Sequence, residues 1–490
     1  MNREHCQPAP FVVRSRCSTQ RLTPRAAPVK EFAMRPSRFF SVILVTFAVM
    51  AIASSSAAQT VTTLYSFSGQ NSSGIPGLVV PAQGRDGKLY GTTFGPSGSA
   101  GSIFKASTIA GITQLYTFGS DGSNPEPGLT LGTDGNFYGT TLSGGTSNNG
   151  VLFKISPSGT YTVLHEFAGG TDGAVPYAPP IEASDGALYG TTNGTSGAST
   201  VYKYSQGTIS TIYNFDQAHG QSAIGALIQA SDGNLYGTAE FGGANNCGTI
   251  FKLATSGSLL WSYSFPCGLG GAYPTAGLVQ ASDGNFYGTT DAGGNPLGFG
   301  TIFKLSQSGN VSTLYAFKNE PDGGNPIGGL TQGTDGNLYG TTLGGGEFLQ
   351  GTIFQASTSG AHKVLYSLSL KSGDQPLATL LQHTNGKFYG TAQFGGKSNN
   401  GTIYSLDMGL GQFVTFVLPA GKVGQTAQIL GQGLTGTTSV TFNGIAATSF
   451  KVANDTFMTA VVPSGATTGK VVVTTPGGAL TSNVNFRILQ

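Results

Sequence analysis

The stretch Ser282-Asp283-Gly284-Asn285-Phe286-Tyr287-Gly288-Thr289-Thr290 decides the fold, because its core recurs along the chain. The tripeptide Tyr-Gly-Thr occurs seven times at spacings of 47 to 52 residues, beginning at Tyr90, Tyr138, Tyr189, Tyr236, Tyr287, Tyr339 and Tyr389. A period near 50 with four strand-like runs per unit is typical of a β-propeller blade. The sequence therefore predicts an all-β repeat protein.

Each repeat carries four short runs rich in β-branched and aromatic residues and bounded by turn formers. In the fifth repeat they cover residues 277–281, 286–290, 300–305 and 311–317. Such runs predict strands, and Asp-Gly between the first two suits a tight hairpin, because glycine adopts positive φ without steric cost. Each repeat is thus expected to form one four-stranded blade.

The two ends of the repeat array complement each other. Residues 61–67 match a fourth strand without a repeat of their own, whereas the last third run, 401–406, has no fourth run after it. Pairing these two segments would complete the last blade and remove an exposed sheet edge. We therefore predict a seven-bladed β-propeller over residues 59–408. The many short strands of residues 413–490, which lack Tyr-Gly-Thr, predict a small immunoglobulin-like β-sandwich.

The N-terminal region is predicted to be a targeting segment. Arg35 and Arg38 precede an apolar run, 39–53, and small residues up to Ala58, which is the pattern of a secretory signal. We expect residues 1–33 to be an over-extended leader and residues 34–58 to be a signal peptide. No second apolar stretch follows, so the processed chain is expected to be secreted or at the cell surface, without a membrane span.

The charge balance argues against nucleic acid as a partner. Charged residues make up only 9% of the chain, while glycine accounts for 77 of its 490 residues, as suits a turn-dense β protein. Eight of the 24 basic and two of the 22 acidic residues lie in residues 1–58, which leaves 16 basic against 20 acidic residues. The remaining chain has no basic stripe for a phosphate backbone.

Two cysteines, Cys247 and Cys267, lie beyond the N-terminal region. Their midpoint falls in the turn of a predicted hairpin, which places them opposite each other and predicts a disulfide bond. Metal binding is the weaker alternative, because two thiols supply half of a zinc site. No metal or cofactor is expected.

The predicted loops divide unequally between the two ends of the blades. Turns between strands 1 and 2 and between strands 3 and 4 are short and lie on one face, the turn face. Connections 2–3 and 4–1 are long and rich in Gly, Asn and Pro, and they form the loop-rich face, where a rigid scaffold would hold a binding site. They are either polar connectors or binding loops. The residues chosen as candidate contacts are Asn148, Asn149, Asn245, Asn246, Asn399 and Asn400.

Catalytic motifs are scarce. The recurring aspartates of the 1–2 turns, such as Asp283, are expected to be structural rather than metal ligands, and each motif tyrosine is expected to pack between blades. Three residues before each turn aspartate, or Asn385, lies a ring position that contains Leu131 in one repeat. In the others it is polar: Gln83, Glu182, Gln229, Gln280, Gln332 and Gln382. This ring is predicted to face a central channel, either hydrogen-bonded to channel water or forming a ligand site that includes Glu182 as its only acid.

The repeat motifs Asp-Gly-Asn-(Phe/Leu)-Tyr-Gly-Thr-Thr and Gly-Thr-Ile-Phe-Lys, as in residues 335–342 and 351–354, resemble the GloVer tandem-repeat family of exported bacterial proteins. The third and seventh repeats depart from the pattern, with Ala187 for Asn and Asn385 for Asp. Separately, the order of Gly431, residues 440–444 and residues 469–478 resembles the IPT/TIG family. That resemblance implies a surface spacer or adhesion module; the repeat family implies no established activity.

Two classes of function follow from the sequence. The first is a non-enzymatic binding or interaction protein, glycan- or matrix-directed through the loop-rich face, with an extracellular glycan or a surface protein as partner. The second is a polysaccharide-active enzyme with its site on that face or at the channel. A cluster of carboxylates or histidines with perturbed pKa values on the loop-rich face would favour the enzyme.

Overall fold

The computed structural model describes residues 59–69, 74–77, 80–95, 100–194 and 199–490. The predicted leader and signal peptide, residues 1–58, lie outside these described residues. The described chain is all-β, with no α-helix and two short 3-10 turns, η1 (Gly170–Asp172) and η2 (Gly268–Gly270). Among the described residues, no helix has the length and apolar character that a membrane span requires.

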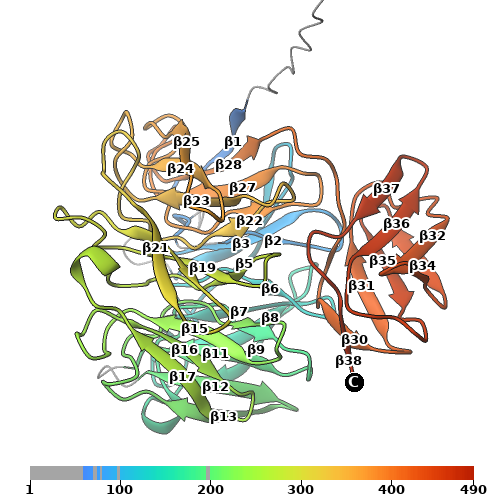
Figure 1. Cartoon of the computed structure of the whole chain (residues 1–490), viewed down its shortest axis with the longest axis horizontal. Coiled ribbons are helices and arrows are strands. Elements are labelled where there is room, and N and C mark those ends of the chain that lie inside the picture. The colour runs from blue at the N-terminus through green and yellow to red at the C-terminus, as the bar shows by residue number, and fades with distance from the viewer. Residues whose placement is uncertain (1–58, 70–73, 78–79, 96–99, 195–198) are drawn as a thin grey trace, which may run out of the picture. The chain divides into compact units, whose positions relative to one another are not determined.

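The Tyr-Gly-Thr repeats form seven four-stranded antiparallel sheets in the described part of the chain (Figure 1). Six of the sheets are built from consecutive strands. The first three are β2 (Ala82–Gln83), β3 (Leu89–Thr93), β4 (Ser102–Ala106) and β5 (Ile112–Thr117); β6 (Thr130–Leu131), β7 (Phe137–Thr141), β8 (Val151–Ile155) and β9 (Tyr161–Glu166); and β10 (Ile181–Glu182), β11 (Leu188–Thr192), β12 (Thr200–Ser205) and β13 (Thr208–Asn214). The next three are β14 (Ile228–Gln229), β15 (Leu235–Ala239), β16 (Thr249–Leu253) and β17 (Leu259–Ser264); β18 (Val279–Gln280), β19 (Phe286–Thr290), β20 (Thr301–Leu305) and β21 (Val311–Ala316); and β22 (Thr331–Gln332), β23 (Leu338–Thr342), β24 (Thr352–Ala356) and β25 (His362–Ser367).

The seventh sheet joins the two ends of the repeat array. It contains β26 (Leu381–Gln382), β27 (Phe388–Ala392), β28 (Thr402–Asp407) and, as its outer strand, β1 (Thr60–Ser66). The register runs from Thr60 opposite Asp407 to Ser66 opposite Thr402, with an irregularity between Thr63 and Tyr65. The predicted pairing of the N-terminal strand with the last repeat is therefore confirmed. Figure 1 shows β1 beside β28.

Each residue of the Tyr-Gly-Thr motif has a separate packing role. The ring of Tyr90 stacks on Phe137 of the following sheet, with ring centroids 4.0 Å apart. A Cβ atom on Gly139 would lie 2.5 Å from the ring of Phe153, so only glycine leaves room for that phenylalanine. The hydroxyl of Thr140 donates to the carbonyl of Ala178, in the connection that leads to the following sheet, at 3.1 Å. The motif thus recurs because it joins neighbouring sheets, as the sequence indicated for its tyrosine.

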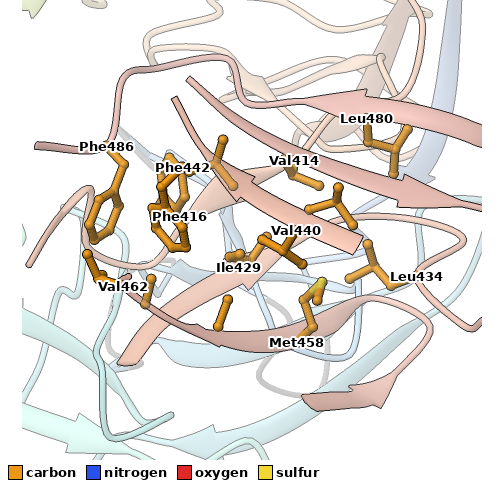
Figure 2. Packing of buried hydrophobic residues seen from close by; sticks show 14 of the residues in the cluster. Val414, Phe416, Ile429, Leu434, Val440, Phe442, Met458, Val462, Leu480 and Phe486 are labelled. Atoms are coloured by element: carbon orange, nitrogen blue, oxygen red, sulfur yellow. The ribbon is translucent and has the colours of Figure 1, made fainter. Parts of the chain in front are cut away.

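The chain after β28 forms a second set of sheets around a separate core. One four-stranded sheet has the order β29-β31-β35-β34 and another the order β33-β32-β36-β37, while β30 and β38 form a parallel pair. The strands are β29 (Thr415–Phe416), β30 (Ala420–Lys422), β31 (Thr426–Leu430), β32 (Ser439–Phe442), β33 (Ile445–Ala446), β34 (Phe450–Asn454), β35 (Phe457–Val461), β36 (Val471–Thr475), β37 (Gly478–Thr481) and β38 (Arg487–Leu489). Side chains from both larger sheets, including Ile429, Met458, Val440 and Phe442, are buried together (Figure 2).

Candidate functional site

The predicted channel ring connects neighbouring sheets. The side-chain oxygen at each of its six polar positions accepts the backbone N–H of the Ser or Thr that begins the 1–2 turn of the preceding sheet. The donor–acceptor pairs are Thr384–Gln83, Thr133–Glu182, Ser184–Gln229, Ser231–Gln280, Ser282–Gln332 and Thr334–Gln382, at 2.7–3.0 Å. Protein donors therefore occupy these acceptors, whereas we predicted channel water or a ligand as their partner.

The remaining position of the ring is filled differently. Leu131 has no side-chain acceptor, and at this junction Arg85 of the first sheet donates to the carbonyl of Thr133 at 2.7 Å. Together with the six polar residues, Arg85 links every sheet to the next, and the pair Thr384–Gln83 returns from the seventh sheet to the first. Glu182 is therefore one of these linking residues, and its hydrogen bonds do not distinguish it from the glutamines.

Three of the six predicted asparagine contacts stabilise their own loops. Asn148, Asn246 and Asn399 have φ values of 53–55°, in the left-handed region that asparagine tolerates. Each side-chain oxygen accepts the N–H of a glycine four residues earlier, at 2.9 Å. The others are partly committed: Nδ2 of Asn245 donates to the carbonyl of Phe265, and Nδ2 of Asn400 donates to that of Ser398. The backbone carbonyl of Asn149 accepts the N–H of Val175.

The turn aspartates form a repeated structural unit. Asp232 accepts the N–H of Asn234, the hydroxyl of Tyr236 at 2.9 Å and the ammonium of Lys252 at 2.9 Å. Burial alone would raise the pKa of Asp232, but the hydrogen bonds from Lys252, Asn234 and Tyr236 lower it to about 2. The same aspartate–tyrosine bond recurs in five other sheets at 2.7–3.1 Å. These hydrogen bonds give the turn aspartates a structural role.

Cys247 and Cys267 form a disulfide bond whose Cα atoms are 5.5 Å apart. The bond lies just beyond the last register pair of β16 and β17, Thr249 opposite Ser264, so it closes the open end of that hairpin. Cys247 is buried. No group of three or more His, Cys, Asp or Glu residues in the described chain is arranged to hold a metal ion.

An unpredicted cluster of ionisable groups lies on the loop-rich face. Glu240 and Asp291 directly follow β15 and β19, the second strands of adjacent sheets, and Glu126 and Tyr177 lie in the connections that lead to β6 and β10. All four side chains are half-buried. We call these four residues the acidic arc. It occupies four consecutive sheets of the array.

Burial and the repulsion between negative charges raise the pKa values of the residues in the acidic arc. Burial raises the pKa of Glu126, of Asp291 and of Glu240, and the negative charge of Asp291 raises that of Glu240 further. The pKa of Tyr177 is raised by burial and then by the charges of Glu126 and Glu240, which places the phenol near both carboxyl groups. Within the described chain, neither glutamate carboxyl group has an ion pair or side-chain hydrogen bond. A half-buried carboxylate without a neighbouring cation lowers the stability of the folded state. Such groups with perturbed pKa values concentrate at functional sites.

Sequence reasoning missed this arc because its members are 51 residues or more apart and occupy two different positions of the repeat. One signal was present. The residue after the second strand is Phe94, Leu142, Asn193, Glu240, Asp291, Leu343 and Gln393 in successive repeats. It is the one strand-end position that varies in chemical type and carries acids in two consecutive repeats.

These features define an all-β, propeller-like repeat protein whose sheets are hydrogen-bonded in sequence. The chain belongs to the Gloeobacter/Verrucomicrobia repeat family, whose model matches residues 51–231 and 223–458. The second match extends past the last repeat into β35. No curated protein matches the chain.

Several solved structures are similar over most of their own length. Hydrazine synthase from Kuenenia stuttgartiensis has a TM-score of 0.47 and 15% identity over 67% of this chain and 95% of that one. Oligogalacturonate lyase from Vibrio parahaemolyticus has a TM-score of 0.42 and 12% identity, covering 71% and 97%. A putative 6-phosphogluconolactonase from Bacteroides fragilis has a TM-score of 0.45 and 16% identity, covering 71% and 91%.

Proposed function

We propose that the protein is an exported binding protein that takes an extracellular glycan on its loop-rich face. In this proposal the seven sheets are the blades of one seven-bladed β-propeller, and residues 413–490 form an immunoglobulin-like domain of the IPT/TIG type that acts as a spacer at the cell surface. The hydrogen bonds that run from each sheet to the next and return through Thr384 and Gln83 support the closed ring.

The acidic arc carries the proposal. Glu126, Tyr177 and Glu240 offer carboxyl and phenol groups on one face that the fold leaves without cationic partners, and the charges of both glutamates act on the phenol of Tyr177. Sugar hydroxyl groups both donate and accept, so they satisfy such groups without bringing a second buried charge. A half-buried phenol ring also provides the amphipathic contact surface that suits a pyranose ring. Each sheet contributes few groups, and a polymer that spans several sheets would gain affinity through multivalency.

The test combines binding with stability. A glycan array probed with residues 59–490 would identify a ligand, and calorimetry would then compare Glu240→Gln with Glu347→Gln, an exposed acid in a loop of the same face. We expect Glu240→Gln to weaken binding about tenfold while Glu347→Gln has no effect. An array without any bound glycan, or equal affinity of both variants, would contradict the proposal.

Stability gives an independent reading of the same variant. A carboxyl group whose pKa is raised in the folded state binds its proton more tightly there than in the unfolded state. Its contribution to the free energy of unfolding therefore falls as the pH rises from the unfolded-state pKa through the folded-state pKa. Glu240→Gln removes this cost, and we expect the variant to be more stable at pH 7 by about 0.5–2 kcal/mol. At pH 3, where the carboxyl group is protonated in both states, the difference should disappear.

The acidic arc also meets the criterion stated above for an enzyme, because its carboxyl groups lie on the loop-rich face with raised pKa values. A polysaccharide-active enzyme is therefore the second candidate, with Glu240 and Asp291 as its carboxyl groups. Glycoside hydrolysis uses two carboxyl groups, one of them with a raised pKa that lets it act as a general acid. Release of reducing ends from a bound polysaccharide, abolished by Asp291→Asn and by Glu240→Gln, would support the enzyme. Turnover that is lost in Glu182→Gln instead would place the chemistry at the channel ring.

A further inference from the structure

A cavity of about 490 Å³ lies beside the turn face, away from the acidic arc. One wall is the 1–2 turn of the sixth sheet, with Gln332 and Thr334, and the neighbouring Ser282. The other wall contains Gln412, in the connection to the C-terminal sheets, and Lys470, next to β36. A volume in the range of roughly 300–1,000 Å³ is usual for small-ligand sites. No acidic residue lines this cavity.

Lys470 is the single charged group in the cavity wall. Its ammonium donates one hydrogen bond, to the backbone carbonyl of Asn483 at 2.6 Å, and forms no ion pair within the described chain. Its pKa is lowered by partial burial, without a compensating carboxylate. The motif lysines differ: Lys105 and Lys252, for example, lie 2.8 and 2.9 Å from turn aspartates. Lys470 thus keeps two N–H donors and its positive charge for a ligand.

The cavity wall also holds neutral polar groups without protein partners. The hydroxyls of Ser282 and Thr481 and the side-chain amide of Gln412 make no hydrogen bond to the described part of the chain. Nε2 of Gln332 is committed to the carbonyl of Gly336 at 2.9 Å, and its oxygen to the N–H of Ser282 at 2.8 Å, so this side chain is held in place. One unpaired cation surrounded by hydroxyl and amide groups complements a molecule that carries one anion and several hydroxyls.

We propose that this cavity binds an acidic sugar residue of a uronate-containing glycan, with the carboxylate on the Lys470 ammonium and the ring hydroxyls on Ser282, Gln412 and Thr481. An ammonium–carboxylate hydrogen bond is among the stronger polar contacts, and partial burial lessens its screening by salt. The cavity is lined by residues of the turn face and of the C-terminal sheets, so this site is separate from the loop-rich face. The inference therefore does not depend on the proposed function.

The test uses two matched sugars, β-1,4-linked trimannuronate and β-1,4-linked mannotriose, which differ only at C6. Calorimetry on residues 59–490 at low ionic strength should give at least tenfold tighter binding of trimannuronate. Lys470→Gln should remove that preference. Lys451→Gln, which removes an exposed lysine from β34 of the same set of sheets, should keep it. Glu240→Gln should also keep it, which separates this site from the acidic arc.

Thermal melting shows whether the Lys470→Gln variant is folded. If it does not fold, Gln412→Ala and Thr481→Ala, two exposed positions, replace it, and each should weaken trimannuronate binding about threefold or more at an unchanged melting temperature. Equal affinity of the wild type for the two sugars would overturn the inference. Equal loss in Lys451→Gln and Lys470→Gln would also overturn it, because that result indicates general attraction of anions.

Discussion

Gln83 and Thr384 are 301 residues apart in the chain, yet the side-chain oxygen of Gln83 accepts the backbone N–H of Thr384 at 3.0 Å. Nε2 of Gln83 donates in turn to the hydroxyl of Thr384 at 2.7 Å. Both residues are buried. This pair joins the first sheet to β26–β28 of the seventh, which are the last strands of the repeat array.

Gln83→Ala should destabilise the protein by about 1–3 kcal/mol, because it leaves the buried N–H of Thr384 without an acceptor. Urea denaturation measures the loss. Gln332→Ala is the matched control, since it removes the same type of bond from Ser282, which is exposed and can bind water instead. Equal losses in the two variants would mean that the burial of the donor does not determine the cost.

Removal of β1 should open the edge of the seventh sheet. A chain that begins at residue 68 lacks the outer strand that pairs with β28 and also lacks the buried Phe67. We expect a lower melting temperature and concentration-dependent aggregation, because the free edge of β28 can pair with other chains. A synthetic peptide of residues 59–69, added in trans, should restore the melting temperature by strand addition. An unchanged melting temperature without the peptide would contradict closure by β1.

The disulfide bond between Cys247 and Cys267 can be tested by thiol labelling. Thiol labelling of residues 59–490, unfolded without reductant, should find no free thiol, since Cys247 and Cys267 are its two cysteines. Replacing both by serine should cost at most about 3 kcal/mol, the chain-entropy value for a loop of this size. The measured loss should be smaller, because β16 and β17 already pair. Stoichiometric labelling before reduction would show that the bond is absent.

His383 should make stability depend on pH. Its side chain is 1% exposed, and Nδ1 accepts the N–H of Asn385 while Nε2 donates to the carbonyl of Gly87. Burial lowers its pKa to about 4. The folded state therefore favours the neutral ring, and the unfolded state binds more protons between pH 6.5 and 4. This contribution to stability is complete above pH 6.5 and falls by roughly 3 kcal/mol as pH drops to 4.

His383→Ala tests that dependence, because other repeats have alanine or glycine at this position, such as Ala281. Denaturation at a series of pH values should show a smaller loss between pH 6.5 and 4 in the variant than in the wild type. His219→Ala, which changes a partly exposed histidine beside Asp216, should retain the wild-type slope. Identical slopes for the wild type and His383→Ala would contradict a buried neutral ring.

The repeated part of the structure was predictable because each motif residue acts locally and in every copy. The stacking of Tyr90, the space left by Gly139 and the closing role of β1 all follow from one period and its two incomplete ends. The ring of glutamines was found, but its bonds were not, because they depend on the relative offset of neighbouring sheets. Hydrogen bonds between Gln229 and Ser184, for example, link positions 45 residues apart.

The acidic arc was not predictable for a related reason. Glu126 and Glu240 occupy different positions of their repeats, and their common effect on Tyr177 arises only when a 4–1 connection and a 2–3 loop meet on one face. Asn148 shows the converse. Its place in a polar loop suggested ligand contact, whereas its left-handed backbone and its bond to Gly144 give it a structural role.

The pairing of β1 with β28 has a consequence for biosynthesis. Ser66 is paired with Thr402, so β1 waits after its synthesis for 336 further residues before its partner exists. At about 5–20 residues per second this interval is on the order of 20–70 s. Throughout it the nascent chain carries an unpaired strand at one end and an incomplete sheet array at the other. Chaperones that shield such edges should therefore raise the yield of folded protein, without changing the stability of the protein once it has folded.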